Sequence, residues 1–177
     1  FFFFFYKFES IKKNKYDFIL CHVGVVDFSP RIEHDVKSIL KFKKNKIVKL
    51  FGINYYNNLL NNKPYSVKYN NKKTSSILNI KNFDAIIKKL NKIENLIWIN
   101  CNRVIYDWNG NYKRKRPKNI NLVHEKSIDF NSKLHIKKII DLTKWNNNDI
   151  KTYTCDNIHF THGGMTLIEN KLKKIIK

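Results

Sequence analysis

Continuous apolar runs alternate along this chain with segments whose apolar positions recur at helical spacing. Residues 16–23 form a nearly continuous apolar run that ends at Gly24, a pattern typical of a central strand buried on both faces of a parallel sheet. Residues 31–44 follow Pro30 and carry apolar side chains at helical spacing, so we expect a helix there. This part of the chain is therefore predicted to form strand, loop and helix.

The same alternation continues to the last residues. Residues 75–92 carry a helical apolar stripe, and residues 95–100 resemble a second buried strand. A helix is predicted over residues 120–130, a last strand over residues 136–142, and a closing helix after Gly163-Gly164. Such alternation predicts a parallel sheet between helical layers, with ligands collecting at the carboxyl ends of its strands.

Two segments fit this scheme less well. Residues 46–51 are predicted to form a short strand, whereas residues 54–74 are rich in Asn, Tyr and Lys, contain Pro64 and are expected to be irregular. The chain contains neither a GxGxxG nor a GxSxG motif, and no Gly-rich phosphate loop. These absences argue against nucleotide binding and against a nucleophile elbow.

Composition favours one folded domain spanning residues 1–177. The chain has 177 residues and 42% hydrophobic residues, enough for a core without disulfides or metal. Its three cysteines, Cys21, Cys101 and Cys155, are far apart, as expected for reduced thiols in a cytoplasmic protein. No apolar run has transmembrane length, and we expect no membrane span.

The formal net charge of +21 suggests a nucleic-acid partner, because basic surfaces neutralise phosphates. Only four of the 35 basic residues are arginines, however, and arginine is the residue best suited to read bases and to fork onto phosphate. We therefore interpret most of the lysine excess as solvated surface and do not expect nucleic acid as the partner. The rival interpretation is a module that binds nucleic acid or an acidic polymer through residues 113–118, with stacking on Tyr55, Tyr56, Tyr65 and Tyr69.

The candidate chemistry lies near the carboxyl terminus, at Asp156 and His159. Two residues separate them, so in a tight turn the carboxylate can orient the imidazole and stabilise its cation, which makes His159 a general base. We expect a strand before this turn, which would place the pair at the carboxyl end of the sheet. Cys155 and His162 add metal-ligand types, but no second cluster has suitable spacing, so we expect no metal or other cofactor.

This segment resembles the last motif of the SGNH, or GDSL-like, hydrolase family. That motif is Asp-x-x-His followed by an aromatic residue, a small hydroxyl residue, a glycine and a helix, and Asp156, His159, Phe160, Thr161 and Gly164 match it. The resemblance implies a three-layer α/β/α domain with a flavodoxin-like parallel sheet. It also implies ester hydrolysis or acyl transfer by a serine nucleophile, with His159 as base and Asp156 as its orienting partner.

A second block, residues 23–27, is similar to the family's Gly-x-Asn-Asp motif. The resemblance gives the Gly24 N–H a role in the oxyanion hole, but Val26 stands where the family has a donating asparagine. Loss of one such donor typically lowers turnover by about 10²- to 10³-fold. Asn100 or Asn102, at the end of a predicted strand, is a candidate replacement donor.

The family's Gly-Asp-Ser motif, which carries the nucleophile, is missing from these residues. Because the sequence starts at Phe1 rather than Met, we expect the first strand and its serine to precede it and the domain to be incomplete at its N-terminus. The alternative is a catalytically inactive protein with the same fold. The expected substrate is a small ester or an acylated glycan or lipid, and the oligomeric state is left open.

Overall fold

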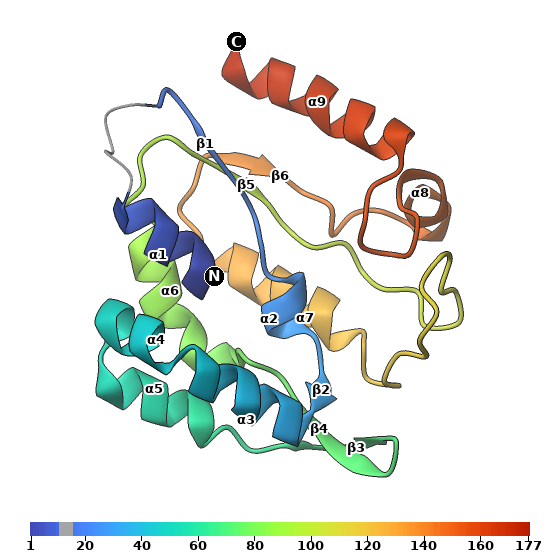
Figure 1. The fold of residues 1–177 in the computed structure, drawn as a ribbon. Helices are drawn as coiled ribbons and strands as arrows, with labels where there is room; N and C mark the ends of the chain where they lie inside the picture. The colour runs from blue at the N-terminus through green and yellow to red at the C-terminus, as the bar shows by residue number, and fades with distance from the viewer. Residues whose placement is uncertain (11–15) are drawn as a thin grey trace.

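The computed structural model describes residues 1–10 and 16–177, which form a mixed α/β fold (Figure 1). Its parallel sheet has three strands in the order β1 (Ile19–His22), β5 (Leu96–Ile99) and β6 (Lys138–Ile140). All three strands lie within segments predicted from the apolar runs, and each is shorter than its run. The middle strand β5 is buried at every position, as expected for a strand with a neighbour on each side.

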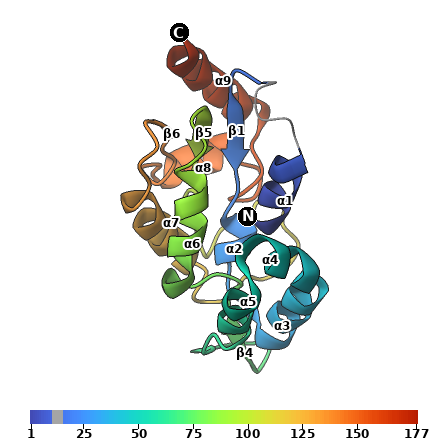
Figure 2. The ribbon, with the colours of Figure 1, turned by 90° about the vertical axis from the view of Figure 1, so that its left-hand side faces the viewer.

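Strand β1 is not the central strand that its apolar run suggests. Within the described residues it pairs only with β5, so it forms one end of the sheet next to α1 (Phe2–Ser10), as Figure 2 shows. Leu20 is half exposed and His22 is exposed, because no strand of the described residues covers the other edge of β1. An unpaired strand edge presents free N–H and C=O groups that can pair with a further strand.

Helices pack on both faces of the parallel sheet because successive side chains of a strand point to opposite faces. On one face Leu96 and Trp98 pack into the larger hydrophobic cluster, whereas Ile99 and Ile140 pack into a smaller cluster on the other. The larger cluster includes α1, α6 (Phe83–Leu90) and α7 (Leu122–Ser132); the smaller one includes α8 (Asn147–Tyr153) and α9 (His162–Ile176). The helices expected over residues 120–130 and after Gly163-Gly164 are thus confirmed, although the last helix begins at His162 and includes both glycines.

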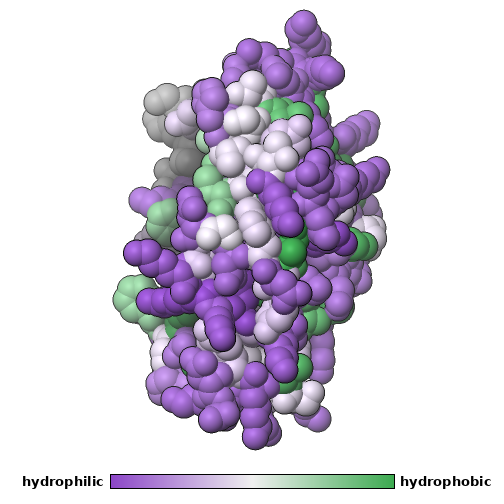
Figure 3. Space-filling model, turned by 90° about the vertical axis from the view of Figure 1, so that its right-hand side faces the viewer, coloured by the Kyte–Doolittle hydropathy of each residue, from purple (hydrophilic) through white to green (hydrophobic). Residues whose placement is uncertain are grey.

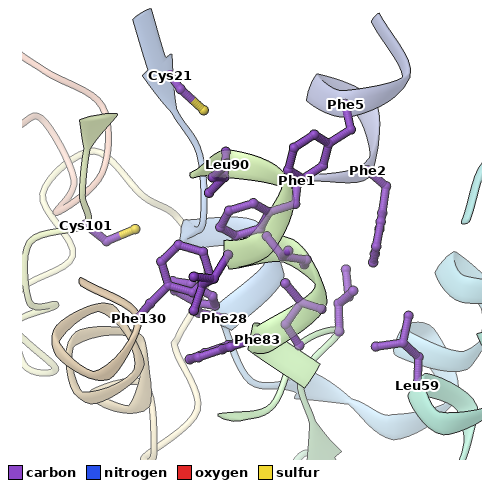
Figure 4. Packing of buried hydrophobic residues seen from close by; sticks show 14 of the residues in the cluster. Phe1, Phe2, Phe5, Cys21, Phe28, Leu59, Phe83, Leu90, Cys101 and Phe130 are labelled. Carbon is purple, nitrogen blue, oxygen red and sulfur yellow. The ribbon is translucent and has the colours of Figure 1, made fainter. Parts of the chain in front are cut away.

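Four phenylalanines form the centre of the larger cluster (Figure 4). The ring centroids of Phe83 and Phe130 lie 5.0 Å apart in an edge-to-face arrangement, and Phe28 lies 5.3 Å from Phe83. Phe1 completes the group at 5.1 Å from Phe130. Tilted and edge-to-face pairs of this kind are the geometry that aromatic rings favour. The cluster fixes α2 (Val25–Phe28), α6 and α7 relative to one another, and α2 follows directly on Gly24.

The segment between β1 and α6 builds a second group of elements, in the lower part of Figure 1. A short antiparallel sheet has the strand order β2 (Arg31–Ile32), β4 (Lys72–Ser75), β3 (Tyr65–Tyr69). The elements are α2 (Val25–Phe28), β2 (Arg31–Ile32), α3 (Glu33–Phe42), α4 (Lys44–Phe51), α5 (Ile53–Leu60), β3 (Tyr65–Tyr69), β4 (Lys72–Ser75) and the 3-10 turn η2 (Ile80–Asn82). The predicted helix over residues 31–44 corresponds to α3.

In this region two predictions are wrong and a third is confirmed only in part. Residues 46–51 belong to helix α4, in which Ile47 and Leu50 are buried one turn apart, and are not a strand. Residues 54–74 are not irregular, because they contain most of α5 and the β3–β4 hairpin. The helix expected over residues 75–92 begins only at Phe83, after a connection that also buries Ile77 and Leu78.

A buried lysine anchors the β3–β4 hairpin to the rest of the fold. The Lys126 ammonium of α7 donates to the Tyr65 hydroxyl at 2.7 Å and to the Leu78 carbonyl at 2.8 Å. Burial lowers the pKa of Lys126 to about 7, since the charged form loses its hydration. The hairpin position therefore depends on α7 as well as on its own strands.

Candidate active site

Asp156 and His159 lie in a tight turn that follows helix α8. Thr154 and Phe160 form an antiparallel bridge across the turn, and the Cys155 N–H donates to the His159 carbonyl at 2.7 Å. Asn157 adopts a φ of 73°, a left-handed conformation that asparagine tolerates better than most residues. A helix, and not the expected strand, precedes the turn. The sequence missed α8, although Asn146 and Asp149 form its capping box.

The turn brings the two predicted catalytic side chains together. Asp156 Oδ2 lies 2.9 Å from His159 Nδ1, while Asp156 Oδ1 accepts the backbone N–H groups of His159 and Ile158 at 2.8 and 3.0 Å. The Asp156 side chain is 8% exposed and that of His159 is 77% exposed. A carboxylate facing Nδ1 favours the tautomer with the proton on Nδ1, which leaves the lone pair on Nε2. Within the described residues Nε2 has no hydrogen-bond partner, so it can accept a proton.

Asp156 is held in its ionised form. Burial opposes ionisation of this carboxyl, but the His159 N–H, the His159 imidazole and the Ile158 N–H together outweigh it and place the pKa of Asp156 below its usual value. The pair therefore consists of a fixed carboxylate and an exposed imidazole at neutral pH.

Residues distant in sequence hold the turn in place. Asn157 accepts the Ile105 N–H at 2.7 Å and donates to the Trp108 carbonyl at 2.6 Å. The buried Arg116 side chain donates to the Asp156 carbonyl at 2.6 Å. These contacts with distant residues could not be predicted from the sequence. The only signal available was the asparagine inside the Asp-x-x-His turn, a residue type that tolerates a left-handed backbone. The turn is thus positioned by the 103–119 loop, which wraps around it.

The turn lies beside the carboxyl end of β1. The Phe160 ring stacks on the His22 ring with centroids 5.3 Å apart and an interplanar angle of 6°. His22 is the last residue of β1, and Gly24 follows two residues later. The two sequence blocks that resemble the SGNH family therefore meet at one edge of the parallel sheet, even though the turn itself does not follow a strand.

Gly24 has the conformation and surroundings of a position that requires glycine. Its φ is 124°, and a Cβ built there would lie 3.0 Å from the Phe28 ring and 3.1 Å from the Cys101 sulfur. Gly24 is buried at the start of α2, and its N–H has no acceptor among the described residues. This N–H is therefore an unused donor near the end of β1, as an oxyanion role requires.

The candidate replacements for the missing oxyanion asparagine are already engaged. The Asn100 amide donates to Asp141 at 2.6 Å, and its oxygen accepts the Leu142 N–H at 2.5 Å. The Asn102 amide donates to the Asn157 carbonyl at 2.9 Å. Both side chains are buried and tie strands or turns together, so neither replaces the donor that Val26 lacks.

Neither Ser29 nor the buried cysteines Cys21 and Cys101 supply a nucleophile to His159. Ser29 is buried, and its hydroxyl donates to the Val25 carbonyl at 2.5 Å. Burial raises the pKa of the Cys21 and Cys101 thiols to about 12, which keeps them protonated. Among the described residues no group of three or more His, Cys, Asp or Glu side chains could hold a metal ion.

The tyrosines of the rival binding interpretation do not form a stacking platform. The Tyr55 hydroxyl donates to the Asn82 carbonyl, Tyr56 is buried, and the Tyr65 hydroxyl donates to Asn79. Tyr69 alone lies at the basic run, where its hydroxyl donates to the Lys115 carbonyl at 2.7 Å. Three of the four rings therefore contribute to packing and hydrogen bonding inside the fold.

None of the helices in residues 1–10 and 16–177 combines the length and apolar character needed to span a bilayer. Comparison with known proteins finds no matching family model, no matching curated protein and no matching solved structure. The resemblance to SGNH hydrolases therefore rests on the two sequence blocks.

Proposed function

We propose that this chain belongs to an SGNH-like ester hydrolase or acyl-transfer enzyme in which His159 is the general base and Asp156 orients it. The observation that carries the proposal is the 2.9 Å contact between the buried Asp156 carboxylate and Nδ1 of the exposed His159, next to the end of β1. A spacing of three residues alone has many structural explanations. The hydrogen-bonded pair with a free Nε2 is the arrangement that a general base requires.

The proposed reaction uses two acyl transfers. His159 Nε2 removes the proton from a serine hydroxyl as the serine oxygen attacks the acyl carbon, and the Gly24 N–H stabilises the oxyanion. The imidazolium then protonates the leaving alcohol, which leaves an acyl-serine. Water, deprotonated by the same nitrogen, then attacks the acyl-serine; the bond between the acyl carbon and the serine oxygen breaks, the imidazolium returns the proton to that oxygen, and the carboxylic acid is released. An alcohol in place of water would give acyl transfer.

Within residues 1–10 and 16–177, β1 has a strand on one edge only, and its other edge supports a fold of the SGNH type, with three layers and a further strand. An apolar groove of about 430 Å³ runs beside this strand and is lined by Phe4, Phe8, Ile19, Leu20 and Val23, among others. We propose that this edge accepts a parallel strand whose carboxyl end carries the serine. A strand at this edge would end near His22, and therefore near the His159 turn.

The second candidate function is an inactive protein with the same fold. It is favoured by Val26, which is half exposed and has no side-chain donor, and by the engagement of Asn100 and Asn102 in other hydrogen bonds. In that case the Asp156–His159 pair would only stabilise the turn. Chemical labelling of the nucleophile separates the two candidates.

We expect a fluorophosphonate probe to label one serine of the full-length protein, because such probes react with serines activated by a general base. Mass spectrometry of the labelled peptide identifies the residue. The label should disappear in His159→Ala and persist in His162→Ala, an exposed histidine three residues away. Absence of labelling in the folded wild-type protein would reject the hydrolase in favour of the inactive candidate.

A further inference from the structure

Two segments far apart in the sequence form one basic surface. The β3–β4 hairpin and the 103–119 loop together expose seven cationic side chains, which define this basic surface: Lys68, Lys72, Lys73, Lys113, Arg114, Lys115 and Lys118. Figure 3 faces the side on which the loop and the hairpin lie in Figure 1, and hydrophilic side chains cover most of it. Sequence alone shows only the run at residues 113–118.

Direct contacts fix the two segments against each other. The Tyr69 hydroxyl of β3 donates to the Lys115 carbonyl at 2.7 Å, and the Asn119 amide donates to the Thr74 hydroxyl of β4 at 3.1 Å. The hairpin is also anchored to α7, because the Lys126 ammonium donates a hydrogen bond to the Tyr65 hydroxyl of β3. The hairpin and the loop are therefore held side by side. Lys72 pairs with Tyr69 across the strands and points to the same face of the hairpin, whereas Lys68 and Lys73 point to the opposite face.

The two segments contain a single acidic residue, Asp107, which precedes the basic run and forms no ion pair with these cations among the described residues. Residues 61–83 and 108–124 contain no Asp or Glu, and none of the seven cations makes an ion pair within the part of the chain that the structure describes. Elsewhere lysines are paired, as Lys37 is with Glu33 and Lys173 with Glu169. Concentrated positive charge without counter-charges attracts a polyanion and speeds its association.

The basic surface adjoins the candidate active site through the same loop. The Asn111 N–H donates to the Cys155 carbonyl at 2.9 Å, and Arg116 donates to the Asp156 carbonyl at 2.6 Å. Lys113, Arg114 and Lys115 lie between these two contacts in the sequence. An anionic chain bound along the basic surface would therefore extend toward the His159 turn.

We propose that the substrate is an acidic glycan that carries O-acyl esters, and that the basic surface binds its negative groups. This substrate assignment rests on the proposed ester-hydrolase function. Removal of an acyl group breaks the bond between the acyl carbon and the sugar oxygen; water supplies the hydroxyl of the carboxylic acid and the proton of the freed sugar hydroxyl. Sugar hydroxyls can carry acyl esters, whereas the phosphodiesters of nucleic acids offer no acyl carbon. Six of the seven cations are lysines, which bind anions as point charges without base recognition.

The test measures binding and needs no nucleophile. Fluorescence anisotropy with a labelled oligogalacturonate at physiological salt compares the wild-type protein with the variant K72Q/K113Q/K115Q. The matched control is K41Q/K88Q/K92Q, which removes the same charge from exposed lysines on α3 and around the end of α6. We expect Kd to rise about tenfold in the first variant and less than about threefold in the control.

Equal weakening in both variants would overturn the proposed surface, because generic attraction to a polycation would then explain binding. Equal affinity for a neutral maltooligosaccharide would also overturn it. Tighter binding of single-stranded DNA, lost with the same three lysines, would replace the glycan by a nucleic acid. Each of these results is independent of fluorophosphonate labelling, so failure of the substrate assignment and failure of the hydrolase proposal are distinguishable.

Discussion

Replacing Asp156 by asparagine is expected to lower kcat/KM for ester hydrolysis by about 10²- to 10⁴-fold without unfolding the turn. The asparagine oxygen can still accept the backbone N–H groups of Ile158 and His159, which Asp156 Oδ1 accepts in the wild type. Its amide nitrogen would then face His159 Nδ1 as a donor. Nδ1 must therefore accept, the proton moves to Nε2, and His159 loses the lone pair that removes the serine proton.

The measurement combines hydrolysis rates with nitrogen-15 NMR of the His159 ring in its neutral form. The wild type should show the proton on Nδ1, and Asp156→Asn should show it on Nε2. Asp149→Asn is the control, because Asp149 caps α8 nearby through the Asn146 N–H and does not contact His159. An unchanged tautomer together with unchanged activity would contradict the role of Asp156.

The pH dependence follows from the lowered pKa of Asp156. Its folded pKa lies below its unfolded value, so its contribution to stability is complete above the unfolded pKa of about 4 and is lost as pH falls through the folded pKa. The carboxylate is therefore ionised throughout the neutral range. The lower rate of Asp156→Asn should therefore extend across the neutral range.

The second large effect is expected at Gly164, where Gly164→Ala should destabilise the fold by about 1–3 kcal/mol. A Cβ at this position would overlap the Tyr153 carbonyl oxygen and lie 3.2 Å from Phe160 Cβ. That carbonyl accepts the Thr161 N–H at 3.0 Å, so α8 and α9 meet here backbone to backbone. The added methyl group must push the helices apart or displace the turn between them.

The neighbouring glycine provides the control for this prediction. A Cβ at Gly163 has nothing nearer than the Thr161 hydroxyl at 3.8 Å, and Gly163 is exposed within α9. Gly163→Ala should therefore stabilise the helix by up to about 1 kcal/mol, because alanine favours helix over glycine. Urea unfolding of both variants measures the difference. Similar midpoints for the two would show that the α8–α9 contact is not close-packed.

The sequence predicted the strands and helices where apolar patterns were long and regular. Residues 95–100 gave β5 because a strand covered on both edges and both faces needs apolar residues throughout. The run of residues 16–23 has the same apolar pattern, yet Leu20 is half exposed, and among the described residues β1 has only β5 as a neighbour. The prediction of a central strand failed because the apolar pattern of one strand does not show whether a second neighbouring strand is present. The position of a strand in the sheet depends on its neighbouring strands as well as on its own sequence.

Short patterns were misread for identifiable reasons. Residues 46–51 are too few to distinguish a strand from a helix by the periodicity of their apolar positions. In the structure they are helical, and Ile47 and Leu50, three residues apart, are buried on one side of α4. The β3–β4 hairpin was missed although Asn70 and Asn71 both have positive φ, the signature of a turn that joins two strands. Because asparagine is frequent throughout this chain, the Asn70-Asn71 pair was interpreted as ordinary surface residues and not as the turn of a hairpin.

The candidate site divides in the same way. The pairing of Asp156 with His159 was predictable because one turn of four residues brings the two side chains together. Its supports were not, since Asn157 contacts residues 102–108 and Arg116 contacts Asp156 across some 40 to 55 positions of sequence. Asn102, predicted as an oxyanion donor, instead belongs to this supporting network.

The most direct test of the central claim is hydrolysis of p-nitrophenyl acetate by the full-length protein and its His159→Ala and His162→Ala variants. We expect His159→Ala to lower kcat/KM by about 10²- to 10⁴-fold, because the attacking serine loses its general base. His162→Ala should retain wild-type activity, since its exposed side chain makes no contact with Asp156. Undiminished hydrolysis by a folded His159→Ala protein would contradict the assignment of His159 as the catalytic base.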